Sequence, residues 1–67
     1  MSIAKVTEIT ASSPTSFEAA IQEGITRSAK TLKHIEGAWI NEQTVVVKNG
    51  KITEYRVNMR VTFVLED

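Results

Sequence analysis

The sequence contains no cysteine and only one histidine among its 67 residues. Disulfide bonds are therefore excluded, and a transition-metal site lacks the second nitrogen or sulfur ligand that it needs. A chain of this length buries a core that barely offsets the conformational entropy lost on folding, so domains of this size commonly rely on disulfides, metals or association. With the first two excluded, we expect the subunit to associate with copies of itself.

Charge of one sign and aromatic residues are also scarce. Eight Lys and Arg balance eight Asp and Glu, and aromatic residues make up 6% of the chain. Nucleic-acid binding driven by phosphate neutralisation is therefore not expected. Uninterrupted apolar runs do not exceed three residues, so we expect neither a membrane span nor a signal peptide, and we predict a soluble, cytoplasmic protein.

Motifs that support catalysis are missing as well. The three glycines stand apart, so the sequence has no glycine-rich loop for phosphate groups. Ser12, Ser13 and Ser16 have no histidine at a suggestive position, and helix capping explains them better than nucleophilic catalysis. The sequence therefore disfavours an enzyme.

The first half of the chain carries a strand pattern followed by a helix pattern. The segment 3–10 is rich in Ile, Val and Thr and predicts a strand. Two helix starts are compatible with the sequence: Ser13 followed by Pro14, or Thr15, which has capping-box spacing to Glu18.

The helix pattern continues with apolar positions at intervals of three and four residues. Its members are Phe17, Ile21, Ile25, Ser28, Leu32 and Ile35. This spacing predicts an amphipathic helix of about five turns, which Gly37 ends. Gly24 lies beside the apolar stripe, where it costs about 1 kcal/mol relative to alanine, so we expect a close contact at that point.

The second half predicts a long β-hairpin. Asn49-Gly50 is the strongest two-residue turn signal in the chain, because both central residues of such a turn must tolerate positive φ. After the turn, one face of the strand carries Tyr55, Val57, Met59, Val61, Phe63 and Leu65, and the other carries Glu54, Arg56, Asn58, Arg60 and Thr62. A strand of about 14 residues is longer than the predicted helix, so one helix cannot cover the sheet.

Together these patterns predict a single α+β domain over residues 1–67, with the order strand, helix, strand, strand. A right-handed crossover from the first strand to the second leaves room for the third between them, antiparallel to both. Phe17, Ile21, Ile25 and Leu32 are expected to pack against the apolar face of the last strand.

Several segments resemble the dodecin family over nearly the whole chain. These are the Thr-x-Ser-Ser segment before a helix with Ala19-Ala20, the hairpin, Tyr55 and the closing Val-Thr-Phe-Val-Leu-Glu-Asp of residues 61–67. The resemblance implies a three-stranded antiparallel sheet curled around one helix, and twelve such subunits forming a hollow shell. It further implies a non-catalytic protein that holds riboflavin or FMN as a store or sink.

The resemblance also implies where the ligand binds. In typical dodecins, paired flavin rings stack between tryptophans of two symmetry-related subunits, and a glutamine on the last strand hydrogen-bonds the ring edge. Gly37 and Arg56 occupy those positions here. Trp39 offers a displaced stacking platform, and Glu42 keeps the acidic position near the ribityl chain. The implied flavin site therefore comprises Gly37, Trp39, Glu42 and Arg56, in a branch that lacks the usual stacking tryptophan.

Calcium is the alternative ligand. One dodecin-like branch without the tryptophan is associated with calcium, and this chain is similar to it in Gly50-Lys51-Ile52-Thr53 and Glu42-Gln43. Glu8, Glu42 and Glu54 offer hard oxygen ligands, yet no loop has the Asp-rich spacing of a dedicated calcium site. A calcium site would therefore have to be assembled between subunits.

Some of these residues also have structural interpretations. A lone tryptophan on a strand is often an interface anchor, which is the interpretation that the sequence favours for Trp39. Arg56 and Arg60 share a face with Glu54, and ion pairs across subunits are favoured over phosphate binding. Three classes remain: a shell that stores a small ligand, a calcium-binding shell and a purely structural assembly.

Overall fold

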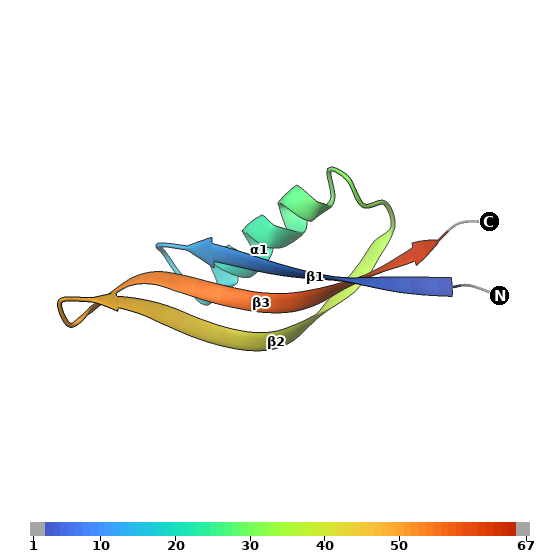
Figure 1. Ribbon diagram of the computed structural model, residues 1–67. Helices are drawn as coiled ribbons and strands as arrows, with labels where there is room; N and C mark the ends of the chain where they lie inside the picture. Colours follow the sequence, from blue (N-terminus) through green and yellow to red (C-terminus); the bar gives the residue numbers. More distant parts are fainter. Residues whose placement is uncertain (1–2, 66–67) are drawn as a thin grey trace.

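The computed structural model describes residues 3–65 as three strands and one helix (Figure 1). The elements are β1 Ile3–Ser13, α1 Phe17–Ser28, β2 Ile35–Lys48 and β3 Lys51–Leu65. β3 lies between β1 and β2 and runs antiparallel to both. The predicted α+β fold and the predicted central place of the last strand are confirmed. Glu66 and Asp67, which end the motif that carried the resemblance, lie outside the described residues.

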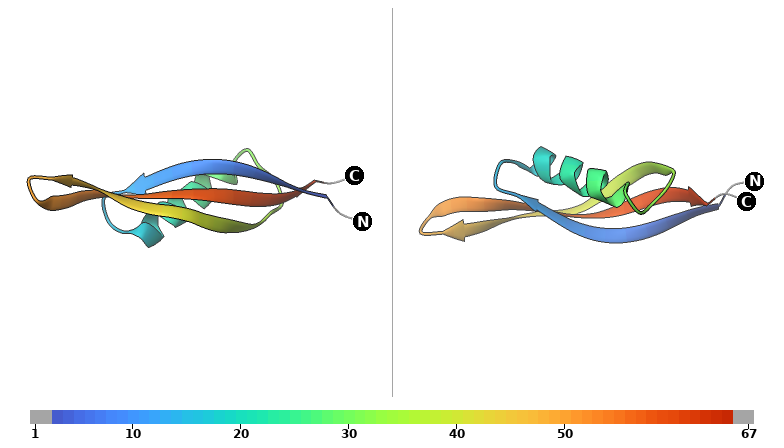
Figure 2. Two further views of the ribbon diagram at one scale, coloured as in Figure 1. Left: turned by 60° about the horizontal axis from the view of Figure 1, so that its bottom comes forward. Right: turned by 90° about the horizontal axis from the view of Figure 1, so that it is seen from above.

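The core lies between α1 and one face of the sheet, where the helix contacts β1 and β3. Figure 2 shows the helix and the sheet from two further directions. Four of its residues have no exposed surface: Ala20 on the helix and Val57, Met59 and Val61 on β3. Phe17, Ile21 and Ile25 pack against this cluster, as predicted. The rings of Phe17 and Tyr55 meet edge to face, with centroids 5.1 Å apart.

Gly24 is a point where the helix lies very close to the sheet. A Cβ atom at this position would lie 2.8 Å from Cε of Met59 and 3.0 Å from Cβ of Ala11. Both distances are shorter than ordinary van der Waals contact, so the predicted close contact is confirmed, and the absence of a side chain is what permits it.

The helix begins at neither of the two predicted caps. Ser16 is the N-cap, with extended backbone and a side chain that accepts a hydrogen bond from the Ala19 N–H at 3.0 Å. Ser13 instead belongs to β1, which continues past residue 10 because pairing with β3 extends to Ser13 and Tyr55. The Ser13 hydroxyl accepts from the Thr15 N–H and supports the turn before the cap.

The predicted five-turn helix is wrong at its end. α1 stops at Ser28, and its last carbonyls accept from the N–H groups of Lys30 and Leu32. β2 begins at Ile35, where it pairs with Phe63, so the chain must leave the helix early enough to return alongside β3. Leu32 therefore lies in the connection, although it still lines a hollow with Phe63 at the end of β3. Apolar spacing alone does not distinguish a helix from a loop and strand that use the same core.

Gly37 does not end a helix. It lies within β2, opposite Thr62, two residues after the strand begins. A Cβ atom at Gly37 would have no neighbour within 4 Å. The position is therefore open, in contrast to Gly24.

The predicted hairpin turn is confirmed. Asn49 and Gly50 connect β2 to β3 with φ angles of 52° and 74°, the positive values that a type I′ turn requires. The hairpin extends well past α1 (Figures 1 and 2), because β3 has 15 residues and α1 only 12. Val47 and Ile52 near its tip are more than half exposed. In the part of the chain that the structure describes, no helix is long and apolar enough to cross a membrane.

Candidate functional site

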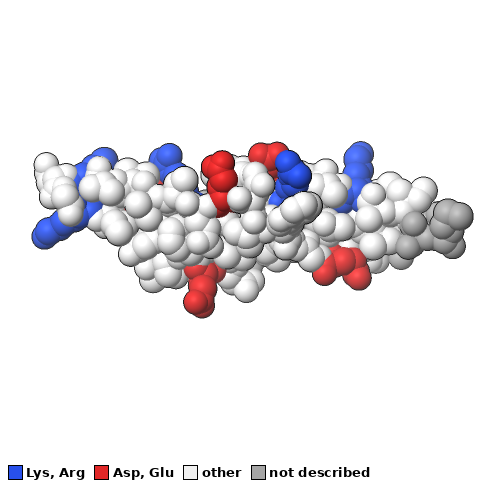
Figure 3. Space-filling model, turned by 90° about the horizontal axis from the view of Figure 1, so that it is seen from below, with Lys and Arg blue, Asp and Glu red and all other residues white. Residues whose placement is uncertain are grey.

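The candidate site lies on the sheet face opposite α1, here called the polar face. Alternation along the strands places every second residue there. The register assigns to it Val6, Glu8, Thr10 and Ser12 from β1, Glu54, Arg56, Asn58, Arg60 and Thr62 from β3, and Gly37, Trp39, Glu42, Thr44 and Val46 from β2. Figure 3 views this face and shows acidic and basic side chains interspersed along it, with basic groups at the hairpin end.

A β-bulge brings Glu42 to the same face as Trp39. Strict alternation would put two residues that are three apart on opposite faces. Ile40 pairs with Met59 and Glu42 pairs with Asn58, so Asn41 is an extra residue in β2. All four residues that the resemblance implied, Gly37, Trp39, Glu42 and Arg56, consequently lie on the polar face.

Trp39 is the most exposed of the large hydrophobic residues that the structure describes, with 66% of its surface accessible. It lies opposite Arg60 on β3, and Cζ of Arg60 lies 5.7 Å from the centroid of the indole ring. This distance is typical of a cation–π contact, which orients the indole without burying it.

A shallow hollow of about 320 Å³ lies next to this pair. Its lining consists of Glu8, Thr10, Asn41, Glu42, Thr44, Arg56 and Asn58. Asn58, in the middle of β3, connects the three strands. Its amide nitrogen donates to Glu8 Oε2 and Thr10 Oγ1 at 3.1 Å, and its oxygen accepts from Asn41 at 3.0 Å. Hydrogen bonds of Asn58 therefore link the three strands across the floor of the hollow.

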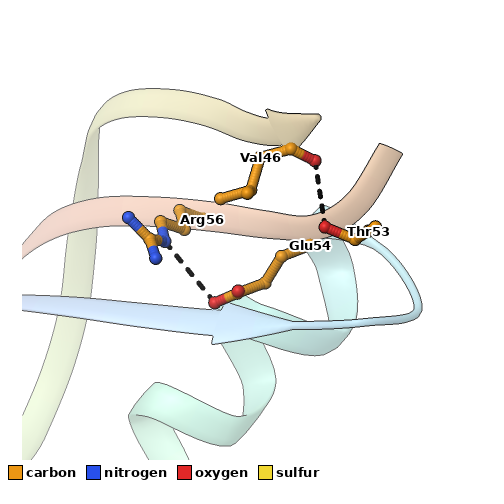
Figure 4. A network of polar contacts seen from close by, with 4 residues as sticks. All are labelled: Val46, Thr53, Glu54 and Arg56. Carbon is orange, nitrogen blue, oxygen red and sulfur yellow. Dashed lines mark hydrogen bonds and ion pairs between the residues drawn. The ribbon is translucent and has the colours of Figure 1, made fainter. Parts of the chain in front are cut away.

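Arg56 is held by an acid of its own strand. Its Nε lies 3.4 Å from Oε1 of Glu54 (Figure 4). A hydrogen bond from Ser12 lowers the pKa of Glu54, and the positive charge of Arg56 acts in the same direction. Arg56 therefore has an acidic partner within its own subunit, whereas the sequence favoured ion pairs across subunits. Figure 4 also shows Thr53, whose hydroxyl donates to the carbonyl of Val46 at 3.3 Å.

The four predicted residues share a face but do not form one cluster within a subunit. Glu42 and Arg56 line the same hollow. Trp39 lies opposite Arg60, four residues from Arg56 along β3, which corresponds to about 13 Å. Gly37 lies opposite Thr62, six residues from Arg56, or about 20 Å away.

The acidic residues that were considered for calcium are also dispersed. Glu8 and Glu42 flank Asn58 from opposite strands, whereas Glu54 lies further along β3 beside Arg56. Within residues 3–65, no three His, Cys, Asp or Glu side chains come together as metal ligands. One subunit therefore offers two carboxylates near the hollow, together with the hydroxyl and amide oxygens that surround them.

Sequence reasoning missed the role of Asn58 in this face. The signal was its central place among the polar positions of the long alternating strand, because a central strand has a neighbour on each side. Its partners were not visible, since Glu8 and Thr10 are some 50 residues away in the sequence.

The comparisons with known proteins agree on one family. A family model described as Dodecin matches residues 3–66. Calcium dodecin from Mycobacterium tuberculosis is 41% identical over 64 residues, which cover 94% of this chain and 89% of that protein. Dodecin from Thermus thermophilus is 33% identical over 63 residues, which cover 94% of this chain and 91% of that protein.

Solved structures agree with these matches. The dodecin from Streptomyces davaonensis has a TM-score of 0.94 at 30% identity and is covered over 97% of its length, with 98% of this chain matched. A crystal structure of calcium dodecin from Mycobacterium tuberculosis, described as having a novel calcium-binding site, has a TM-score of 0.82 at 35% identity. It is matched over 91% of its length and 96% of this chain. The chain therefore belongs to the dodecin family.

Proposed function

We propose that the protein is a non-catalytic, small-ligand-binding assembly of twelve copies of one domain, 1–67, with its ligand on the polar face of the sheet. The observation that carries this proposal is that Gly37, Trp39, Glu42 and Arg56 all lie on one face, with the indole 66% exposed. An exposed indole beside a hydrogen-bonding hollow suits a planar ligand that carries polar groups.

The spacing along the strands supports a site that two subunits share. Within one subunit, the positions of Trp39 and Arg56 lie about 13 Å apart along the strands, so the two residues do not form a compact cluster. A second copy in the opposite orientation brings its Arg56 toward the Trp39 end of the first. The subunit alone also exposes Val47, Ile52 and other apolar side chains, which an assembly covers. A particle of twelve subunits of 7.4 kDa has a mass of about 89 kDa, and light scattering measures it directly.

Flavin is the proposed ligand, bound in a modified form of the family site. Gly37 removes one stacking platform, and Trp39 supplies an indole two residues further along the strand. Arg56 offers donors only, so it cannot accept a hydrogen bond from the flavin imide N–H. We therefore expect riboflavin to bind at least tenfold more weakly than to a dodecin that has both family residues, a difference of about 1.4 kcal/mol or more.

The test is a titration of the assembled protein with riboflavin, followed by quenching of flavin fluorescence. The double variant Gly37→Trp with Arg56→Gln restores both family residues, and Gly37 has open space for the new ring. We expect this variant to bind riboflavin about tenfold or more tightly than the wild type. The single variant Gly37→Phe is the control that adds an aromatic ring of a different shape without changing Arg56.

An unchanged affinity in the double variant would show that a flavin is not held at positions 37 and 56, the positions of the family site. Calcium is then the second candidate, favoured by the match to calcium dodecin and by Glu8 and Glu42 beside Asn58. Oxygen ligands from a second subunit would complete the six to eight that calcium takes. A rise in melting temperature with calcium, lost in Glu42→Gln, distinguishes this case from a purely structural assembly.

A further inference from the structure

The two arginines in the middle of the polar face have different partners. The guanidinium of Arg56 forms an ion pair with Glu54, whose Oε1 lies 3.4 Å from Nε. Arg60 lies over the indole of Trp39, and among residues 3–65 no carboxylate forms an ion pair with it. Arg60 therefore places its positive charge at the exposed aromatic ring without a carboxylate partner among the described residues, whereas Arg56 has such a partner.

We propose that Trp39 and Arg60 form an anion-directed stacking site, in which the indole receives a planar ring and Arg60 binds an anionic group of the same ligand. This inference rests on the proposed function, and it names the chemical class of the ligand as a planar heteroaromatic compound with a phosphate. In this proposal, the residue that favours a ligand with a phosphate is Arg60. It is not Arg56, the arginine that replaces the family glutamine.

The chemistry of the guanidinium supports this arrangement. A planar guanidinium that stacks on an aromatic face directs its N–H groups outward, in its own plane. These donors form charge-assisted, bidentate hydrogen bonds with phosphate oxygens. Trp39 and Arg60 are cross-strand neighbours, so one ligand with a short linker between ring and phosphate can contact both.

The acid that lies opposite Arg60 on β1 is Glu8. Its Oε2 accepts a hydrogen bond from Asn58 at 3.1 Å, and this contact draws the carboxylate toward the hollow. Trp39 lies on the other side of Arg60, on β2. An anion therefore approaches Arg60 from the indole side.

FMN and riboflavin are suitable probes, because they share the ring and differ by one phosphate. We expect the wild-type assembly to bind FMN about tenfold more tightly than riboflavin. In Arg60→Gln this ratio falls to about one. In Arg56→Gln both affinities change together and the ratio remains. Arg27→Gln removes the same charge from the exposed side of α1 and is the control for net charge.

A second measurement tests the anion site without a flavin. Trp39 is the only tryptophan in the chain, so its emission reports on the site. Titration with inorganic phosphate should give a saturable change in this emission in the wild type and in Arg56→Gln, and none in Arg60→Gln.

These measurements separate the inference from the proposed function. If neither flavin binds but phosphate still acts through Arg60, the flavin proposal fails and the anion site stands. If both flavins bind with equal affinity, or if Arg56→Gln abolishes the ratio while Arg60→Gln preserves it, the assignment to Arg60 is wrong.

Discussion

The two faces of the sheet are built from the same strand and serve different purposes. Toward α1, β3 presents Val57, Met59 and Val61, which have no exposed surface. On the opposite face its next neighbours, Arg56, Asn58 and Arg60, remain accessible and contact acids, amides and an indole. Stability is therefore concentrated on one face, and residues on the other are able to change with little effect on the fold. This separation explains how the Trp and Gln of the family pattern can be replaced while the fold is retained.

Removing a core side chain should give the largest effect. Met59→Ala empties part of a fully buried site between β3 and α1. We expect the free energy of unfolding to fall by about 2–5 kcal/mol, from the lost burial and the cavity that remains. Urea denaturation at a fixed protein concentration measures it. A loss below 0.5 kcal/mol, the size expected for an exposed position, would contradict the comparison between the faces.

Adding a side chain should destabilise the protein on the core face and have little effect on the polar face. Gly24→Val places atoms against Met59 and Ala11, and we expect a destabilisation of about 1–3 kcal/mol. Gly37→Val adds the same atoms where nothing lies within 4 Å. It should be neutral or slightly stabilising, because valine suits a strand better than glycine. The two melting temperatures, measured side by side, should differ in this direction, and equal shifts would show that Gly24 is not a close contact.

Titration of an acid on the polar face should give the smallest effect. The pKa of Glu54 is lowered by the hydrogen bond from Ser12 and by Arg56. A group with a lowered pKa stabilises the folded state above its unfolded-state pKa and loses that contribution as the pH falls through its folded-state pKa. Wild type should therefore melt above Glu54→Gln at pH 7, and the difference should disappear in acid. Glu36→Gln is the control for the loss of a carboxylate elsewhere on the sheet. A difference in melting temperature between wild type and Glu54→Gln that persists at about pH 2 would contradict the lowered pKa of Glu54 as its cause.

The parts of the fold that were predictable are those where local sequence acts alone. The alternation of β3 and the Asn49-Gly50 turn depend on neighbours in the chain, and both agree with the structure. The end of α1 depends on where β2 must start in order to pair with Phe63, which no local pattern contains. The N-cap was misassigned for a related reason, because pairing with Tyr55 keeps Ser13 in a strand.

The site was predictable to a similar extent. Alternation placed Arg56 and Arg60 on the face opposite the core. The presence of Glu42 on that face depends on the bulge at Asn41, and the hydrogen bonds of Asn58 depend on the pairing of β1 with β3. The different partners of Arg56 and Arg60 were not predictable, because both residues alternate with core positions of β3 in the same way. They differ only in what they contact, which is Glu54 for Arg56 and Trp39 for Arg60.

The bulge at Asn41 also determines where this strand tolerates a change in length. Loss of Asn41 would remove the extra residue and leave Ile40 opposite Met59 and Glu42 opposite Asn58, at the expense of one hydrogen bond to Asn58. Loss of Thr44, in an unbulged stretch, would turn part of β2 over and exchange apolar for polar positions. Glu36 and Thr53 mark the other two irregularities of the pairing. Insertions and deletions among relatives are therefore expected to concentrate at these three positions, and a sequence alignment that spreads gaps elsewhere along the hairpin would assign residues to the wrong side of the sheet.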